Sequence, residues 1–228
     1  MKIGILRTGA PPAPLIPRFG QYDDMFRGML GTGFDATSYD VVTGTLPGTV
    51  EDQDAYLITG SSAGVYEDHD WLPPLRDFLR SAKGKAKLVG ICFGHQLMAE
   101  TFGGRVEKSD RGWGIGLHRY DVRKIADWMD PVPSFAAIVS HQDQVVEPPP
   151  KATVLAGSDF TPFGLIAYQD QPAISLQPHP EFEPAFGKAL IECRRRRLPD
   201  PDAAIASLDQ AGDGARLGQW IRTFLKKG

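Results

Sequence analysis

The stretch that most constrains the fold runs from Lys87 to Phe102, where an apolar run, a cysteine between glycines and a helical sequence follow one another. Lys87–Ile91 has the length and composition of a buried strand, and Leu97–Phe102 is typical of a helix. The glycines two residues before and after Cys92 permit a sharp turn that lifts its side chain clear of the backbone. A helix that begins here favours negative charge on the sulfur. The stretch therefore predicts a strand, a nucleophile elbow and a helix, with Cys92 as candidate nucleophile.

Strands and helices alternate through the N-terminal part of the chain. We expect strands at Lys2–Leu6, Ala36–Val42 and Asp54–Ile58, and helices at about Phe19–Leu30 and from Trp71 to Leu79. After Gly104, short β-like runs follow one another at Gly116–Val122, Phe135–Ser140, Thr153–Ala156, Gly164–Tyr168 and Ala173–Leu176. This order predicts a three-layer α/β fold, in which helices flank a mainly parallel central sheet that carries an antiparallel extension.

The C-terminal segment, from Glu183 on, is predicted to be helical with a break at Leu198–Pro201. A chain of 228 residues fits one α/β domain. We therefore expect a single domain over residues 1–228, with a core at about 2–190 and a helical tail at 191–228.

Composition and charge exclude several function classes. The formal net charge is -3, which gives no electrostatic case for binding nucleic acid or an anionic membrane. No apolar run is long enough to span a bilayer, and the N-terminus has no signal-peptide pattern. Two cysteines make no disulfide framework, and a reducing cytoplasm suits a catalytic thiol. We expect a cytoplasmic protein without a cofactor or a metal, because His69 and His118 have no convincing ligand spacing.

A second candidate group surrounds His179, which lies between two prolines. A residue before proline avoids the helical region, so His179 is pushed toward an extended conformation. Positions two apart in an extended chain point to the same side, which brings Glu181 next to His179 unless the chain turns. A carboxylate beside an imidazole fixes its tautomer and stabilises its protonated form. The spacing therefore predicts a base with its orienting carboxylate.

At these residues the chain resembles the class I glutamine amidotransferases, which are Cys-His-Glu glutaminases on a flavodoxin-like α/β fold. The resemblance rests on the elbow Gly-Ile-Cys-Phe-Gly-His-Gln, on His179-Pro180-Glu181, on Ile58–Tyr66 and on Ser140–Val145. Residues 18–26 and 112–116 are similar to free-standing, GMP-synthase-like members, and plant γ-glutamyl peptidases belong to the same neighbourhood.

The resemblance implies a mechanism and a role for each site residue. Cys92 would attack a γ-glutamyl amide and His179 would transfer the proton, through a γ-glutamyl thioester that water releases as glutamate. Backbone N–H groups of Phe93 and of Ser61 or Gly60 would form the oxyanion hole. The residues implied to bind substrate are Gln96, His141, Gln142 and Asp143.

Alternatives remain open at the level of the sequence. Cys92 could be a buried small side chain, His179 and Glu181 a local turn, and Arg194–Arg197 a solvated helix face rather than a recognition patch. The leading function is hydrolysis of glutamine by a protein that either delivers ammonia to a separate synthetase subunit or acts alone. The alternatives are a γ-glutamyl peptidase, for which residues 8–18 would shape the leaving-group side, and a catalytically silent binding protein.

Overall fold

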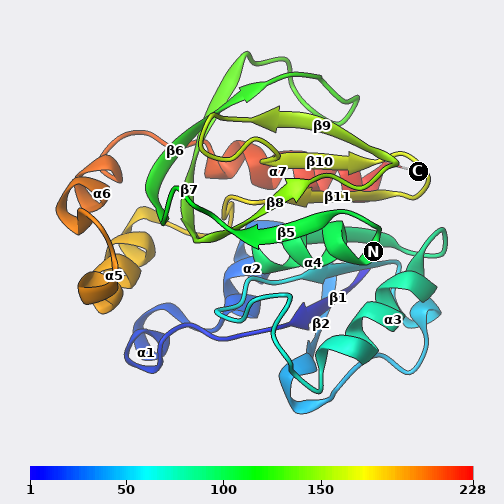
Figure 1. The fold of residues 1–228 in the computed structure, drawn as a ribbon. Helices are drawn as coiled ribbons and strands as arrows, with labels where there is room; N and C mark the ends of the chain where they lie inside the picture. Colours follow the sequence, from blue (N-terminus) through cyan, green and yellow to red (C-terminus); the bar gives the residue numbers. More distant parts are fainter. Residues whose placement is uncertain (228) are drawn as a thin grey trace.

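A computed structural model describes residues 1–227, which are arranged around a nine-stranded sheet (Figure 1). Its parallel part has the strand order β2 (Asp35–Asp40), β1 (Lys2–Arg7), β3 (Ala55–Ile58), β4 (Lys87–Ile91) and β11 (Ala173–Leu176). The antiparallel part continues through β10 (Leu165–Tyr168), β9 (Ala152–Gly157), β6 (Gly114–Val122) and β7 (Ser134–His141). This mixed sheet, with helices on both faces, confirms the predicted α/β fold and its antiparallel extension.

The central strands are apolar on both sides, so both faces of the sheet are buried. In β3, Leu57 belongs to one buried cluster while its neighbours Tyr56 and Ile58 belong to the cluster on the other face. The same alternation separates Ile5 from Leu6 in β1. Because successive side chains of a strand point to opposite faces, helices must cover the sheet twice.

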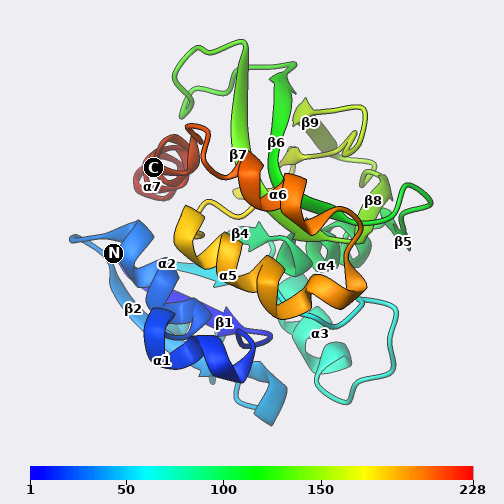
Figure 2. The ribbon, with the colours of Figure 1, turned by 90° about the vertical axis from the view of Figure 1, so that its left-hand side faces the viewer.

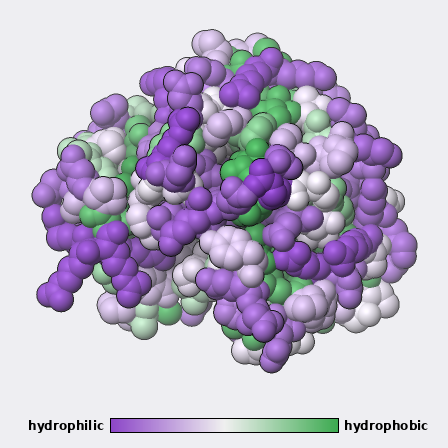
Figure 3. Space-filling view, in the orientation of Figure 1, coloured by the Kyte–Doolittle hydropathy of each residue, from purple (hydrophilic) through white to green (hydrophobic). Residues whose placement is uncertain are grey.

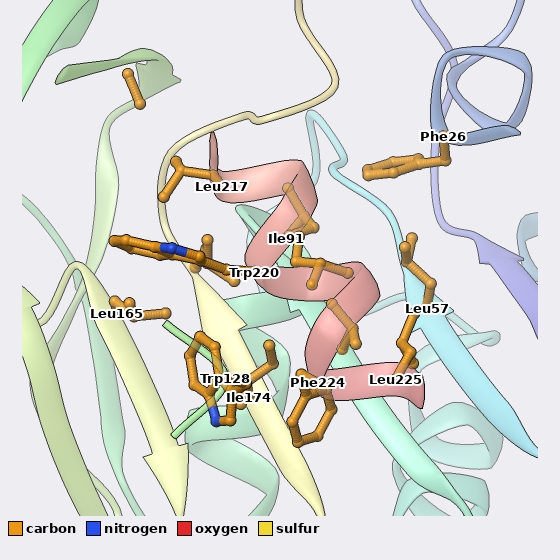
Figure 4. Packing of buried hydrophobic residues seen from close by; sticks show 14 of the residues in the cluster. Phe26, Leu57, Ile91, Trp128, Leu165, Ile174, Leu217, Trp220, Phe224 and Leu225 are labelled. Atoms are coloured by element: carbon orange, nitrogen blue, oxygen red, sulfur yellow. The ribbon is translucent and has the colours of Figure 1, made fainter. Parts of the chain in front are cut away.

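Four helices supply that cover. They are α2 (Tyr22–Leu30) and α7 (Gly214–Lys226) on one face, and α3 (Leu72–Ala82) and α4 (Phe93–Thr101) on the other. Figure 4 shows Leu217 and Trp220 of α7 packed among Ile91, Leu165 and Ile174 from the sheet. Trp220 is only 2% exposed. The predicted helical tail is therefore part of the hydrophobic core.

A third apolar cluster lies beside the antiparallel strands. It contains Phe186 and Leu190 of α5 (Pro184–Arg194), Ala204 of α6 (Pro201–Ser207) and Ile138 of β7. Figure 2 shows α5 and α6 together next to β6 and β7. The shorter segments are α1 (Ile16–Phe19) and 3₁₀ turns at Ala13–Leu15, Val41–Thr43, Val50–Asp52 and Arg195–Arg197.

The structure differs in detail from the expected secondary structure; for example, the strand expected at Ala36–Val42 ends at Asp40. The helix expected at Phe19–Leu30 is divided at Gly20, whose φ of 77° ends α1 before Asp24 caps the start of α2. The pairing of β5 (Arg105–Lys108) with β8 (Asp143–Glu147) was missed. Only Val106 of β5 is buried, so that strand carries almost no hydrophobic pattern.

The surface in Figure 3 is mostly hydrophilic, with smaller hydrophobic areas between the polar side chains. Within residues 1–227, every helix is too short or too polar to cross a bilayer.

Candidate active site

The candidate site lies at the carboxyl ends of three neighbouring parallel strands. The loop after β3 begins at Thr59, the elbow follows β4, and the segment with His179 follows β11. These strands are adjacent in the order β3-β4-β11, so three segments that are far apart in the sequence meet at one edge of the sheet. Open α/β sheets bind ligands at this edge.

Cys92 occupies the predicted elbow between β4 and α4. Its φ of 53° lies in a region that residues other than glycine rarely adopt, at a cost of about 1–3 kcal/mol. The turn is held by the Cys92 N–H, which donates to Leu176 of β11 at 2.8 Å. A Cβ atom on Gly90 would lie 2.5 Å from the Gly94 carbonyl oxygen, and one on Gly94 would lie 2.4 Å from that of Ile58. Both glycines are therefore required by close backbone approach.

His179 and Glu181 form a buried ion pair. The distance from His179 Nδ1 to Glu181 Oε1 is 2.7 Å, and the two residues are 4% and 7% exposed. The contact matches the prediction, but the chain turns at Pro180 rather than remaining extended. Phe182 stacks on the imidazole at a centroid distance of 4.0 Å and an angle of 4°. The carboxylate and this ring together fix the orientation of the imidazole.

The electrostatics of the pair favour the protonated imidazole. Burial alone lowers the pKa of His179, but the Glu181 carboxylate and the Cys92 sulfur outweigh burial and raise the pKa above its usual value. Because Nδ1 faces Glu181, Nε2 is the nitrogen left for the sulfur. An imidazolium next to a sulfur stabilises negative charge on it, which makes the sulfur a better nucleophile.

The loop after β3 approaches both side chains. A Cβ atom on Gly60 would lie 3.1 Å from His179 Cε1 and 3.7 Å from Cys92 Cβ, so only glycine fits without displacing a neighbour. Thr8 anchors this loop: its hydroxyl donates to the Thr59 carbonyl at 3.0 Å and lies 3.3 Å from that of Gly60. The Gly60 carbonyl therefore points toward Thr8. Because C=O and N–H point in opposite directions in a planar trans peptide, the Ser61 N–H points away from Thr8.

Phe93 supplies the other predicted donor from the first turn of α4. The first N–H groups of a helix have no acceptor within the helix. The N–H of Phe93 therefore has no acceptor within its own helix, as a donor of an oxyanion hole requires.

Gln96, His141 and Asp143 form a hydrogen-bonded group close to Cys92. The Gln96 amide donates to the Asp143 carbonyl at 2.7 Å and to Gln177 Oε1 at 3.1 Å, and His141 Nδ1 lies 3.1 Å from the same carbonyl. Burial lowers the pKa of His141 to about 3, which keeps this ring neutral. These side chains hold the backbone at Gln142 and Asp143 in place.

Cys92 opens on a cavity of about 280 Å³. Among the predicted residues, the cavity is lined by Cys92, Ser61, Gln96, His141, Gln142 and Asp143. His179 and Glu181 line a different and larger cavity, of about 660 Å³, which Cys92 does not reach. We assign the chemistry to the smaller cavity because it contains the candidate nucleophile.

Several lining residues were not predicted to face this cavity. Tyr66, Glu67, Lys108, Trp113, Arg194 and Arg197 line it, and the Tyr66 hydroxyl donates to Asp143 Oδ2 at 3.0 Å. Residues 8–18 were expected to shape the leaving-group side. None of them is among the described residues that line the cavity of Cys92. Of that segment, Arg18 lines the larger cavity together with His179, and Thr8 supports the loop after β3.

Fold and site together define an α/β protein with a cysteine at a nucleophile elbow. A model of the glutamine amidotransferase class-I family matches residues 45–192, and the chain belongs to that family. This confirms the resemblance to the class I glutamine amidotransferases.

Curated relatives and solved structures agree with this family. The chain is 31% identical over 182 residues to γ-glutamyl peptidase 2 of Arabidopsis thaliana, a match that covers 76% of this chain and 73% of the relative. It is 32% identical over 115 residues to a glutamine-hydrolysing GMP synthase chain of Methanopyrus kandleri, covering 47% of this chain and 58% of the relative. A glutamine amidotransferase structure from Thermotoga maritima shares the fold with a TM-score of 0.78, at 17% identity over 99% of this chain and 98% of that one.

Proposed function

We propose that this protein hydrolyses a γ-glutamyl amide bond, with Cys92 as nucleophile, His179 as acid and base, and Glu181 as the carboxylate that orients His179. The observation that carries the proposal is the placement of a strained cysteine next to a buried His-Glu pair, at the opening of a cavity. Strain of this kind concentrates at functional sites.

In the first half-reaction the Cys92 sulfur attacks the γ-carbonyl carbon, and a C–S bond forms. The carbonyl oxygen becomes negative and accepts hydrogen bonds from the N–H groups of Phe93 and of Ser61 or Gly60. His179 donates its proton to the departing nitrogen as the C–N bond breaks. The products are a γ-glutamyl thioester on Cys92 and a free amine or ammonia.

In the second half-reaction water replaces the amine. His179, now neutral, takes a proton from the water while its oxygen attacks the thioester carbon. The C–S bond breaks, the sulfur leaves as the thiolate next to the reprotonated imidazole, and glutamate is released. Glu181 holds the imidazole in the tautomer that both steps need.

The relatives support γ-glutamyl chemistry but differ in the amine that leaves. Two of them are named for γ-glutamyl peptides and for glutamine, and the side-chain amide of glutamine is the simplest γ-glutamyl amide. With glutamine, the leaving group is ammonia, which a separate synthetase subunit could use. With a γ-glutamyl peptide, the leaving group is an amino acid or peptide.

A release assay tests this proposal directly. Purified protein is incubated with glutamine, γ-glutamylglycine and γ-glutamylcysteine, and the glutamate formed is measured. We expect the wild-type protein to release glutamate from at least one compound. Cys92→Ser should abolish this release, whereas Cys193→Ser, which changes an exposed side chain on α5, should release glutamate at the wild-type rate. Wild-type protein that releases no glutamate, or Cys92→Ser with full activity, would support the silent-fold alternative.

A further inference from the structure

The four consecutive arginines at the end of α5 divide into two groups. Arg194, which is half-buried, and Arg197, which is exposed, line the cavity that contains Cys92. Arg195 instead pairs with Glu192 and Asp202, and the exposed Arg196 lies outside the lining. Residues three apart lie on the same side of a helical turn, which explains why the first and last arginine share a direction. Only part of the run is therefore a solvated face.

Arg194 and Arg197 carry positive charge that the described part of the protein does not neutralise. Neither makes an ion pair with a carboxylate within residues 1–227, although Arg195 makes two. Arg194 is half-buried, and its Nη1 donates to Ser140 Oγ at 3.1 Å, next to the buried His141. A fixed guanidinium without an acidic partner at the opening of a cavity is suited to bind an anion.

The charged side chains around the cavity form two groups, one with both signs of charge and one that is only positive. Glu67, Asp143 and Lys108 lie near one another, since both Lys108 and Glu67 act on the Asp143 carboxylate. A free glutamyl group ends in an ammonium and a carboxylate, and this mixed cluster offers a partner to each. The two arginines remain as surplus positive charge on the side of the cavity formed by α5 and the turn that follows.

We propose that Arg194 and Arg197 form a subsite for a carboxylate on the leaving group, so that the preferred substrates are γ-glutamyl peptides rather than glutamine. This inference rests on the proposed hydrolysis of γ-glutamyl amides. A γ-glutamyl dipeptide carries a second carboxylate at its C-terminus, whereas ammonia leaves glutamine with none. A planar guanidinium binds a carboxylate through two parallel hydrogen bonds.

Three substrates with one scissile bond test the subsite: γ-glutamylglycine, γ-glutamylglycinamide and glutamine. The variants are Arg194→Gln, Arg197→Gln and the double variant, with Arg196→Gln as matched control because Arg196 lies outside the cavity lining. Charge-assisted hydrogen bonds contribute roughly 10-fold or more to binding. We expect the double variant to lose at least about 10-fold more kcat/KM on γ-glutamylglycine than on the other two substrates, mainly through KM.

Two other outcomes would contradict the arginine subsite, and a third would contradict the proposed hydrolysis. Equal losses on all three substrates would overturn the inference, because the arginines would then bind the carboxylate of the glutamyl group itself. An unchanged preference in the double variant would overturn it as well. Wild-type protein inactive on all three compounds would instead count against the proposed function.

A binding measurement keeps the subsite testable without turnover. In a Cys92→Ala background, calorimetry should show that γ-glutamylglycine binds at least about 10-fold more tightly than its amide, and that the double arginine variant removes this difference. Equal affinity for the acid and the amide in the Cys92→Ala protein would contradict the subsite.

Discussion

Substituting alanine for Gly60 adds one methyl group between the two candidate catalytic side chains. The added Cβ would lie 3.1 Å from His179 Cε1 and 3.7 Å from Cys92 Cβ. Gly60 has no left-handed φ, so alanine is compatible with its backbone. The substitution therefore changes the distance between nucleophile and base without disturbing the loop itself.

The expected loss of kcat depends on how far the added methyl group displaces the His179 imidazole. Carbon atoms in contact prefer separations of about 3.5–4.0 Å, so the imidazole must shift by a few tenths of an ångström or more. It is held by Glu181 at 2.7 Å and by the stacked ring of Phe182. A misplacement of about 1 Å can cost roughly 100-fold in rate, so we expect kcat to fall by roughly 10- to 100-fold.

This loss corresponds to about 1.4–2.7 kcal/mol in activation free energy. The assay is glutamate release under saturating substrate, combined with urea unfolding to compare stability. Gly28→Ala is the matched control, because a Cβ there meets no atom within 4 Å. The control should keep wild-type activity, and Gly60→Ala should unfold within about 1 kcal/mol of wild type. Wild-type kcat in a folded Gly60→Ala protein would refute the proposed role of His179 next to Cys92.

Three further results are expected. Glu181→Gln should retain more glutamate release than His179→Ala, because an amide can still hold the imidazole while alanine removes the base; the reverse order would contradict their assigned roles. Gly94→Ala should lower the free energy of unfolding in urea by roughly 1–3 kcal/mol, since its Cβ would lie 2.4 Å from the Ile58 carbonyl oxygen; unchanged stability would argue against the close approach. Burial lowers the pKa of His95 in the folded protein to about 3, whereas in the unfolded chain it is about 6.5. Above about pH 6.5 the ring is neutral in both states, and its contribution to stability is fully present. As the pH falls from about 6.5 toward 3, only the unfolded chain takes up the proton, so this contribution is lost. In urea unfolding between pH 4 and 8, His95→Gln should reduce the slope of stability against pH by up to about 1.4 kcal/mol per unit; an unchanged slope would show that the ring is not buried in its neutral form.

The elbow was predictable because its signal is local. Glycines on both sides of Cys92, between an apolar run and a helix, specify a strand, a turn and a helix without reference to the rest of the chain. The contact of His179 with Glu181 was predictable for the same reason. That His179 meets Cys92 depends on β4 and β11 being neighbours; the resemblance implied this meeting, and local spacing alone did not.

The lining of the cavity was less predictable because it depends on tertiary packing. Arg194 and Arg197 reach the cavity only because α5 packs through Phe186 and Leu190 against Ile138 of β7. A run of four arginines has no apolar periodicity that would distinguish the two members that line the cavity. The contacts of Thr8 with Thr59 and Gly60 were also unpredictable from local sequence, because they join residues about fifty positions apart.

Labelling with a glutamine-mimicking diazo-ketone, followed by peptide mapping in a mass spectrometer, tests the central claim most directly. Cys92 is buried at 5% exposure, whereas Cys193 is exposed, so accessibility alone favours reaction at Cys193. If the cavity binds a glutamyl group next to an activated sulfur, Cys92 reacts much faster, and glutamine or γ-glutamylglycine protects it while Cys193 is unaffected. Labelling of Cys193 at an equal or higher rate, with no protection of Cys92 by either compound, would contradict the assignment of Cys92 as the nucleophile of a γ-glutamyl hydrolase.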